Sequence, residues 1–202
     1  MKRVILVLVA TLLCATTQAQ SLGDMLKSLS SALTSTSEKP KEEAPKPSYP
    51  TEKELIGEWT FEQLDMEYTG DDPLASVAIA SAKTQIPTLT AQAGLEAGKD
   101  KLHINNDGTL VFTTSGKSVL ARYSYIQPTG TLIVTVEDKT RKAIFTTLVS
   151  KKDGQLRVMF DANELMAIAE ANVPNLKEDS TFVMAKTLVG TYKGILIGGI
   201  FK

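Results

Sequence analysis

Cysteine, histidine and tryptophan each occur only once in this 202-residue chain. The lone Cys14 excludes a disulfide within the chain, and with it the class of small domains that several disulfides hold together. The lone His103 leaves too few nitrogen and sulfur ligands for a tetrahedral zinc site. We therefore expect no metal site and no bound cofactor.

A charge excess of either sign is also lacking, because 22 basic residues face 23 acidic ones and leave a net charge of −1. A protein that neutralises many nucleic-acid phosphates needs a basic excess or a dense basic patch, and the sequence has neither. Apolar residues make up 43% of the chain, which is more than an intrinsically disordered chain carries. The composition predicts a folded protein with no nucleic-acid partner.

Long apolar runs are absent too, since the longest, residues 4–13, is about half of the ~20 residues that span a bilayer. This run follows Lys2 and Arg3 and precedes the small-residue site at residues 17–19. The three parts together predict a secretory signal peptide over residues 1–19, cleaved before Gln20. We expect export to the periplasm or the extracellular space.

A lipid anchor on Cys14 is the alternative interpretation of the same leader. It is disfavoured because Leu13, rather than a small residue, precedes the cysteine. Cleavage before Gln20 instead leaves a chain without cysteine, with 20 basic and 23 acidic side chains and a net charge of −3.

Residues 20–50 combine an amphipathic segment with a polar linker. The linker, residues 34–50, has four prolines and many charges, and this composition predicts an extended spacer. A helix as short as residues 21–33 is marginal in water, so it has to pack on its own domain, a second copy or another partner. A membrane face is disfavoured because its polar side carries only Lys27 as a basic residue. The apolar stripe that is the candidate surface for self-association consists of Leu22, Met25, Leu26, Leu29 and Leu33.

Residues 51–202 are predicted to form one domain that is mainly β. From Lys101 onward apolar residues alternate with polar ones, and turn residues separate the runs at 106–108, 127–130 and 153–154. This pattern is typical of an antiparallel sandwich or barrel. Arg122 and Arg157 fall at outward positions of short strands, so we expect no membrane span.

Two helical interruptions are predicted within the domain. Asp72-Pro73 is typical of a helix start, with a helix over residues 74–86 that Pro87 ends and a second piece over 89–98. Residues 161–164 have capping-box spacing ahead of a short helix that Pro174 ends. Residues 182–186 and 189–201 are predicted to be strands.

Gly57-Glu58-Trp59 opens the first predicted strand, and a G-x-W motif at this place resembles the lipocalin and calycin-type barrels. The whole order of signal peptide, polar tail, G-x-W, helical insertion, barrel strands and Gly-rich end is similar to an uncharacterised lipocalin-like family of secreted Bacteroidota proteins. The resemblance implies a meander barrel of about 8–9 strands, with a helical insertion after the first strand and a short helix near the C-terminal third. We expect Trp59 to plug the barrel floor and Gly57 to let the backbone pass close beneath it.

Residues suited to catalysis are few, and each has a simpler structural role. His103 falls at an outward strand position, so we expect a surface residue rather than a general base or a metal ligand. The adjacent carboxylates at 71–72 and 137–138 suit helix capping and strand ends, and 105–108 suits a hairpin turn. No G-x-S-x-G motif and no phosphate-binding glycine loop occurs. We predict that the protein is not an enzyme.

Two functions remain for such a barrel. It is either a carrier of a small hydrophobic ligand or a periplasmic or surface interaction module whose barrel is filled. Tyr123 and Tyr125 are the candidate polar anchors for a ligand. The candidate residues of the ligand cavity are Leu110, Phe112, Tyr123, Tyr125, Val134, Phe145 and Phe160.

Overall fold

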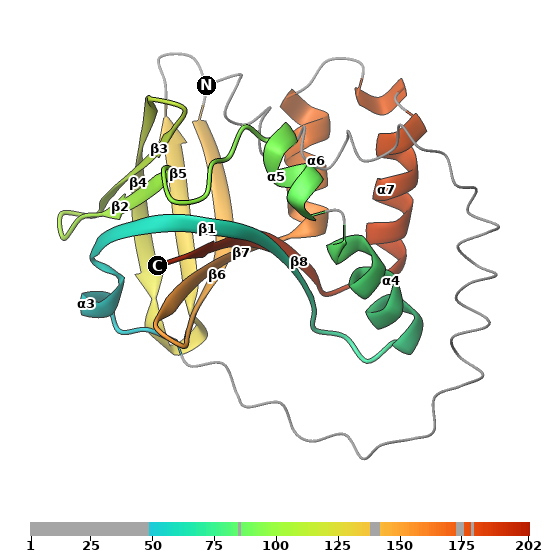
Figure 1. Cartoon of the computed structure of the whole chain (residues 1–202), viewed down its shortest axis with the longest axis horizontal. Helices are drawn as coiled ribbons and strands as arrows, with labels where there is room; N and C mark the ends of the chain where they lie inside the picture. The colour runs from blue at the N-terminus through green and yellow to red at the C-terminus, as the bar shows by residue number, and fades with distance from the viewer. Residues whose placement is uncertain (1–48, 85, 138–141, 173–175, 179) are drawn as a thin grey trace.

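The computed structural model describes residues 49–84, 86–137, 142–172, 176–178 and 180–202. Within them eight antiparallel strands close into a barrel in chain order, and β8 pairs back with β1 (Figure 1). This confirms the predicted meander barrel. The strands are β1 (Gly57–Tyr68), β2 (Lys101–Ile104), β3 (Thr109–Thr114), β4 (Lys117–Ile126), β5 (Thr131–Glu137), β6 (Lys142–Lys152), β7 (Gln155–Asp161) and β8 (Ile195–Phe201).

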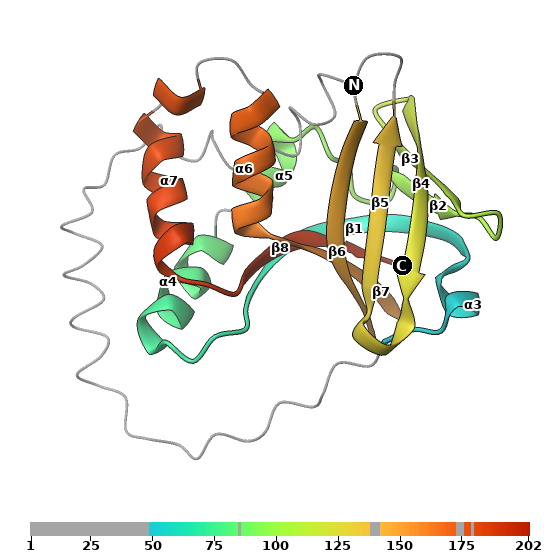
Figure 2. The ribbon, with the colours of Figure 1, turned by 180° about the vertical axis from the view of Figure 1, so that it is seen from behind.

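Helices interrupt the meander at the two predicted places. The insertion after β1 contains α4 (Pro73–Lys83) and α5 (Ile86–Gln92), and the insertion after β7 contains α6 (Ala162–Asn172), the 3₁₀ turn η2 (Leu176–Glu178) and α7 (Ser180–Thr191). These helices gather on one side of the barrel, whereas the short α3 (Glu52–Leu55) lies on the opposite side (Figures 1 and 2). A further 3₁₀ turn, η1 (Gln127–Thr129), joins β4 to β5.

The carboxylates expected at helix starts cap those helices. Asp72 accepts hydrogen bonds from the main-chain N–H groups of Leu74 and Ala75, with Pro73 in the first position of α4. Asp161 accepts in the same way at the start of α6. Pro87 does not end a helix as predicted; it is the second residue of α5, where a helix needs no main-chain donor.

Residues 182–186, predicted to be a strand, lie in the helix α7 instead. The apolar residues of this stretch, Phe182 to Ala185, are consecutive, so period alone did not decide between helix and strand. Val189 is 5% exposed and packs into a cluster with residues of α4 and α6. Since β8 begins only at Ile195 and completes the barrel with β7 and β1, no strand position is left for this segment.

The apolar core has two parts. One fills the barrel and includes Phe61, Ile104, Leu132 and Leu156. The other lies between the extended ends of β1 and β8 and the helices, and it includes Met66, Ile79, Met166 and Ile195. Leu64 packs against both, so the barrel interior continues into the helical layer.

The predicted leader over 1–19, Cys14, and the apolar stripe with all but the end of its linker lie outside the described residues.

Candidate functional site in the barrel interior

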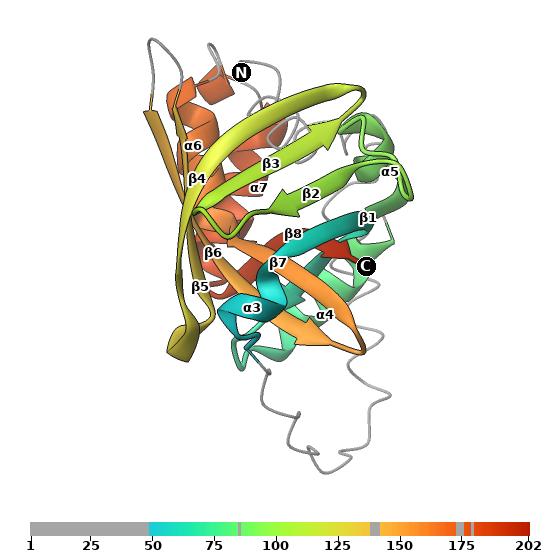
Figure 3. The same ribbon diagram turned by 90° about the vertical axis from the view of Figure 1, so that its left-hand side faces the viewer.

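One end of the barrel is closed by α3 and the only tryptophan. Thr51 and Glu54 form a capping box that fixes α3, and Leu55 at its end is fully buried. The indole Nε1–H of Trp59 donates to the carbonyl oxygen of Leu55 at 2.9 Å, and the half-buried ring packs against the barrel core. Figure 3 shows α3 beside the start of β1. Trp59 therefore joins the start of β1 to α3 and to the barrel core.

Gly57 is required for a different reason from the one expected. A Cβ atom on Gly57 would meet no atom within 4 Å, so no backbone passes close beneath it. Its φ of +147° is instead a conformation that residues with side chains rarely adopt. The glycine lets the chain turn from α3 into β1.

The seven cavity candidates all face the barrel interior. Tyr123 pairs with Val134, and Val134 pairs with Phe145, so these three side chains form a row across β4, β5 and β6. Phe145 continues this row to Phe160 of β7 through an edge-to-face contact with ring centroids 6.3 Å apart. We call Tyr123, Val134, Phe145 and Phe160 the inner row.

The inner row differs in exposure from the rest of the interior. Ile104, Leu132 and Leu156 are at most 1% exposed, and Leu110 is 6% exposed. Phe112, Tyr125 and all members of the inner row are half-buried. Leu110 is therefore part of the packed core rather than of an accessible surface, and the accessible apolar surface runs along β4–β7.

Charged residues take inward positions on β4–β7 only at strand ends. By register these are Lys117 and Lys151, and Lys151 forms an ion pair with Glu54 of α3 at the closed end. The middle of this wall is apolar apart from Thr147, whose hydroxyl donates to the Leu132 carbonyl oxygen. Such a wall suits an uncharged apolar molecule.

The two tyrosines expected to anchor a ligand bind the main chain instead. The Tyr123 hydroxyl donates to the Asn105 carbonyl oxygen and the Tyr125 hydroxyl to the Pro50 carbonyl oxygen, both at 2.7 Å. Burial raises the pKa of both phenols. Both hydroxyl protons are thus donated within the chain. Tyr123 holds the β2–β3 turn in place, and Tyr125 holds the chain at Pro50, just before α3.

A family model described as a lipocalin-like domain (DUF4923) matches residues 18–202. The chain belongs to this lipocalin-like family. The predicted family is thereby confirmed, and the match includes both the barrel and the segment that precedes it. No curated protein and no solved structure matches the chain significantly.

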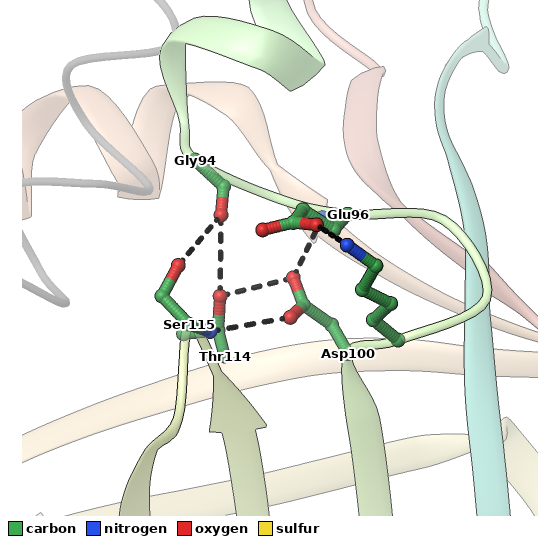
Figure 4. Close-up of polar contacts among 6 residues, drawn as sticks. Gly94, Glu96, Asp100, Thr114 and Ser115 are labelled. Atoms are coloured by element: carbon green, nitrogen blue, oxygen red, sulfur yellow. Dashed lines mark hydrogen bonds and ion pairs between the residues drawn. The ribbon is translucent and has the colours of Figure 1, made fainter.

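A buried carboxylate outside the barrel interior was missed by sequence reasoning. In this lipocalin-like domain Asp100 is 2% exposed and accepts hydrogen bonds from the Thr114 hydroxyl and the Glu96 N–H, both at 2.9 Å, and from the Ser115 N–H at 3.4 Å (Figure 4). The Thr114 and Ser115 hydroxyls also reach the Gly94 carbonyl oxygen. Asp100 thus joins the loop before β2 to the β3–β4 hairpin.

A second missed cluster lies outside the barrel. Arg157 of β7 faces outward as predicted, but only 15% of its side chain is exposed because it pairs with Asp65 and Glu67 of β1. Asp65 also binds Lys83 of α4 at 3.0 Å. The cluster ties β7, β1 and α4 together across β8.

The remaining candidate residues that the structure describes do not assemble into a catalytic or metal site. His103 is exposed on β2. Among the described residues no three His, Cys, Asp or Glu side chains are grouped so as to hold a metal ion. Over the same residues, no helix has both the length and the apolar character needed to cross a membrane.

Proposed function

We propose that this lipocalin-like protein is exported, is not an enzyme, and carries a small uncharged apolar ligand in its barrel. The observation that supports this most directly is the half-buried inner row, in a barrel whose closed end is otherwise tightly packed. A barrel of eight strands is just wide enough to hold one small ligand. Partly accessible apolar side chains on the inner wall supply the surface that such a ligand would cover.

The expected affinity is modest. Burying a ten-carbon chain gains roughly 8 kcal/mol at ~0.8 kcal/mol per CH₂ group, whereas association costs ~4–15 kcal/mol. The hydroxyl protons of Tyr123 and Tyr125 are already used within the chain, so the wall adds few polar contacts. We therefore expect micromolar or weaker binding.

Export is the second part of the proposal. It is supported by the leader pattern of residues 1–19 and by a family match that begins at residue 18, beside the expected cleavage site. The mature protein would start at Gln20 and lie in the periplasm or outside the cell. The intact mass of the protein recovered from the exported fraction tests this, and a mass that retains residues 1–19 or a lipid on Cys14 contradicts it.

Ligand binding is tested with N-phenyl-1-naphthylamine, an uncharged apolar probe whose fluorescence rises in apolar surroundings. Val134→Phe fills space at the inner row, and Ile133→Phe, the outward neighbour on the same strand, is the matched control. We expect Val134→Phe to weaken probe binding at least tenfold and Ile133→Phe to leave it unchanged. Thermal unfolding of both variants establishes that they are folded.

The alternative is an interaction module with a filled barrel. It is favoured by the two tyrosine hydroxyls that bind the main chain and by the fully buried side chains at the closed end. Absence of probe binding in the unsubstituted protein, together with a ligand-free mass in native mass spectrometry after gentle purification, would support the module and overturn the carrier.

A further inference from the structure

The outer face of β4, β5 and β6 carries large apolar side chains that are open to solvent. Leu120 is 63%, Ile144 55% and Ile126 46% exposed, so this face holds three of the six exposed large apolar residues of the described chain. Exposed apolar side chains that neighbour one another, unlike those scattered singly, are typical of interaction sites.

Strand register makes Ile126 and Ile144 diagonal neighbours of Ile133, whereas Leu120 lies at the far end of β4, beyond Ser124 and Arg122. Ile133 pairs with Thr146, so Ile144 and Leu148, two residues to either side, are its diagonal neighbours on β6. Thr131 of β5 pairs directly with Ile126 on β4 and with Leu148 on β6, so it lies between them. We call this face the outer wall. Its apolar residues are the neighbouring Ile126, Ile133, Ile144 and Leu148, with Leu120 at the far end, and polar residues such as Arg122 and Ser124 lie between them.

The described chain begins at the edge of the outer wall. The Pro50 carbonyl oxygen accepts the hydroxyl of Tyr125, the neighbour of Ile126 on β4. The ring of Tyr49 lies against Gly130, at the turn from β4 to β5, where a Cβ would come within 2.3 Å of it. Tyr49, to which the preceding segment is attached, therefore lies beside the β4–β5 hairpin.

We propose that residues 21–33 of the same chain pack as a helix on the outer wall, with the apolar stripe of Leu22, Met25, Leu26, Leu29 and Leu33 against it. The inference does not depend on whether the barrel holds a ligand. A helix of these 13 residues is ~20 Å long, and the six-residue step from Ile126 to Leu120 covers about the same distance along β4.

The linker is long enough for this packing. The 15 residues 34–48 reach up to ~45 Å at about 3.1 Å per residue, so they can return the segment over the strands next to their starting point. The family match from residue 18 supports a role shared with the barrel, because it includes this segment together with the strands.

Attachment to the same chain also favours packing of the segment on its own barrel over packing on the barrel of a second copy. A tether long enough to reach the wall gives the segment a higher effective concentration there than a second copy has at micromolar protein, so packing within one chain prevails.

Hydrogen–deuterium exchange of residues 21–33 in the chain that starts at Gln20 tests the proposal. An isolated helix of 13 residues exchanges quickly, whereas a docked one is protected. Ile144→Lys disrupts the outer wall, and Leu74→Lys, at a similarly exposed apolar residue of α4, is the matched control. We expect exchange in this segment to become at least tenfold faster in Ile144→Lys and to stay unchanged in Leu74→Lys.

A disulfide experiment identifies the copy that is bound. The chain from Gln20 has no cysteine, so Ser30→Cys can be combined with Thr146→Cys on the outer wall or with His103→Cys on exposed β2 as the control. We expect a disulfide within one chain for the first pair alone. Fast exchange in the unsubstituted protein overturns the docking, and a disulfide between two chains overturns the assignment to the same chain.

Discussion

The indole nitrogen of Trp59 lies 2.9 Å from the carbonyl oxygen of Leu55, which makes the first residues of β1 hold the helix that closes the barrel. Trp59→Ala removes both this hydrogen bond and the ring, and we expect it to lower the free energy of unfolding by about 3–5 kcal/mol. Trp59→Phe keeps most of the packing and should cost about 1–2 kcal/mol. Urea denaturation followed by circular dichroism measures both. A loss under about 1 kcal/mol in Trp59→Ala would show that the ring does not close the barrel.

Substitution by alanine at two glycines should change the free energy of unfolding in opposite directions. Gly57 has a φ of +147°, so Gly57→Ala should destabilise the protein by more than about 1 kcal/mol even though space is free around it. Gly190 lies within α7, and a Cβ there meets nothing within 4 Å, so Gly190→Ala should stabilise by about 0.5–1 kcal/mol. Differential scanning calorimetry gives both shifts. Equal signs would contradict the conformational argument.

Removing the buried charge of Asp100 should loosen the β3–β4 hairpin. Asp100→Ala leaves the main-chain N–H groups of Glu96 and Ser115 without their acceptor and leaves the Thr114 hydroxyl only the Gly94 carbonyl oxygen at 3.4 Å. We expect a loss of about 2–4 kcal/mol. Hydrogen exchange should become faster at Glu96 and Ser115, the two donors on the main chain. Asp153→Asn, in the exposed β6–β7 turn, is the control and should change stability by less than about 0.5 kcal/mol.

The α3 capping box should add acid sensitivity. Hydrogen bonds from the main chain and side chain of Thr51 lower the pKa of Glu54 below its usual 4.5, and Lys151 contributes in the same direction. A lowered folded-state pKa means that the stabilisation is present above pH 4.5 and is lost as the pH falls through the folded value. Glu54→Gln should therefore reduce the fall in stability below that pH. Chemical denaturation at pH 7 and at more acid values measures the difference, and identical profiles for Glu54→Gln and the unsubstituted protein would contradict it.

The strands were predictable because their signals are local. Alternation such as Leu132, Val134 and Val136, which begins directly after the turn at Gly130, needs no knowledge of the rest of the chain. The helix starts at Asp72 and Asp161 were predictable for the same reason, since a cap and its helix lie within a few residues.

The errors and omissions have causes that the local sequence does not contain. Residues 182–186 became helical because the barrel is completed by β8, and that depends on strand pairing across the whole chain. Asp100 and Thr114 are 14 residues apart, and Asp65 and Arg157 are 92 apart, so nothing near either residue indicates its partner. The inner face of each strand followed from alternation, whereas the hydrogen bonds of Tyr123 and Tyr125 to the main chain depend on how the ends of the barrel fold.

The pairing of β1 with β8 has a consequence for the order of folding. The first and last strands of the barrel meet along seven residue pairs, and Thr60 exchanges two main-chain hydrogen bonds with Lys202. A pairing with so large a sequence separation carries a high loop-closure entropy, so this seam is expected to form late. Until β8 pairs with both strands, β1 and β7 each present an unpaired edge that can recruit another chain. The interval between synthesis of β7 and arrival of β8 is therefore the period in which this protein is most prone to aggregate.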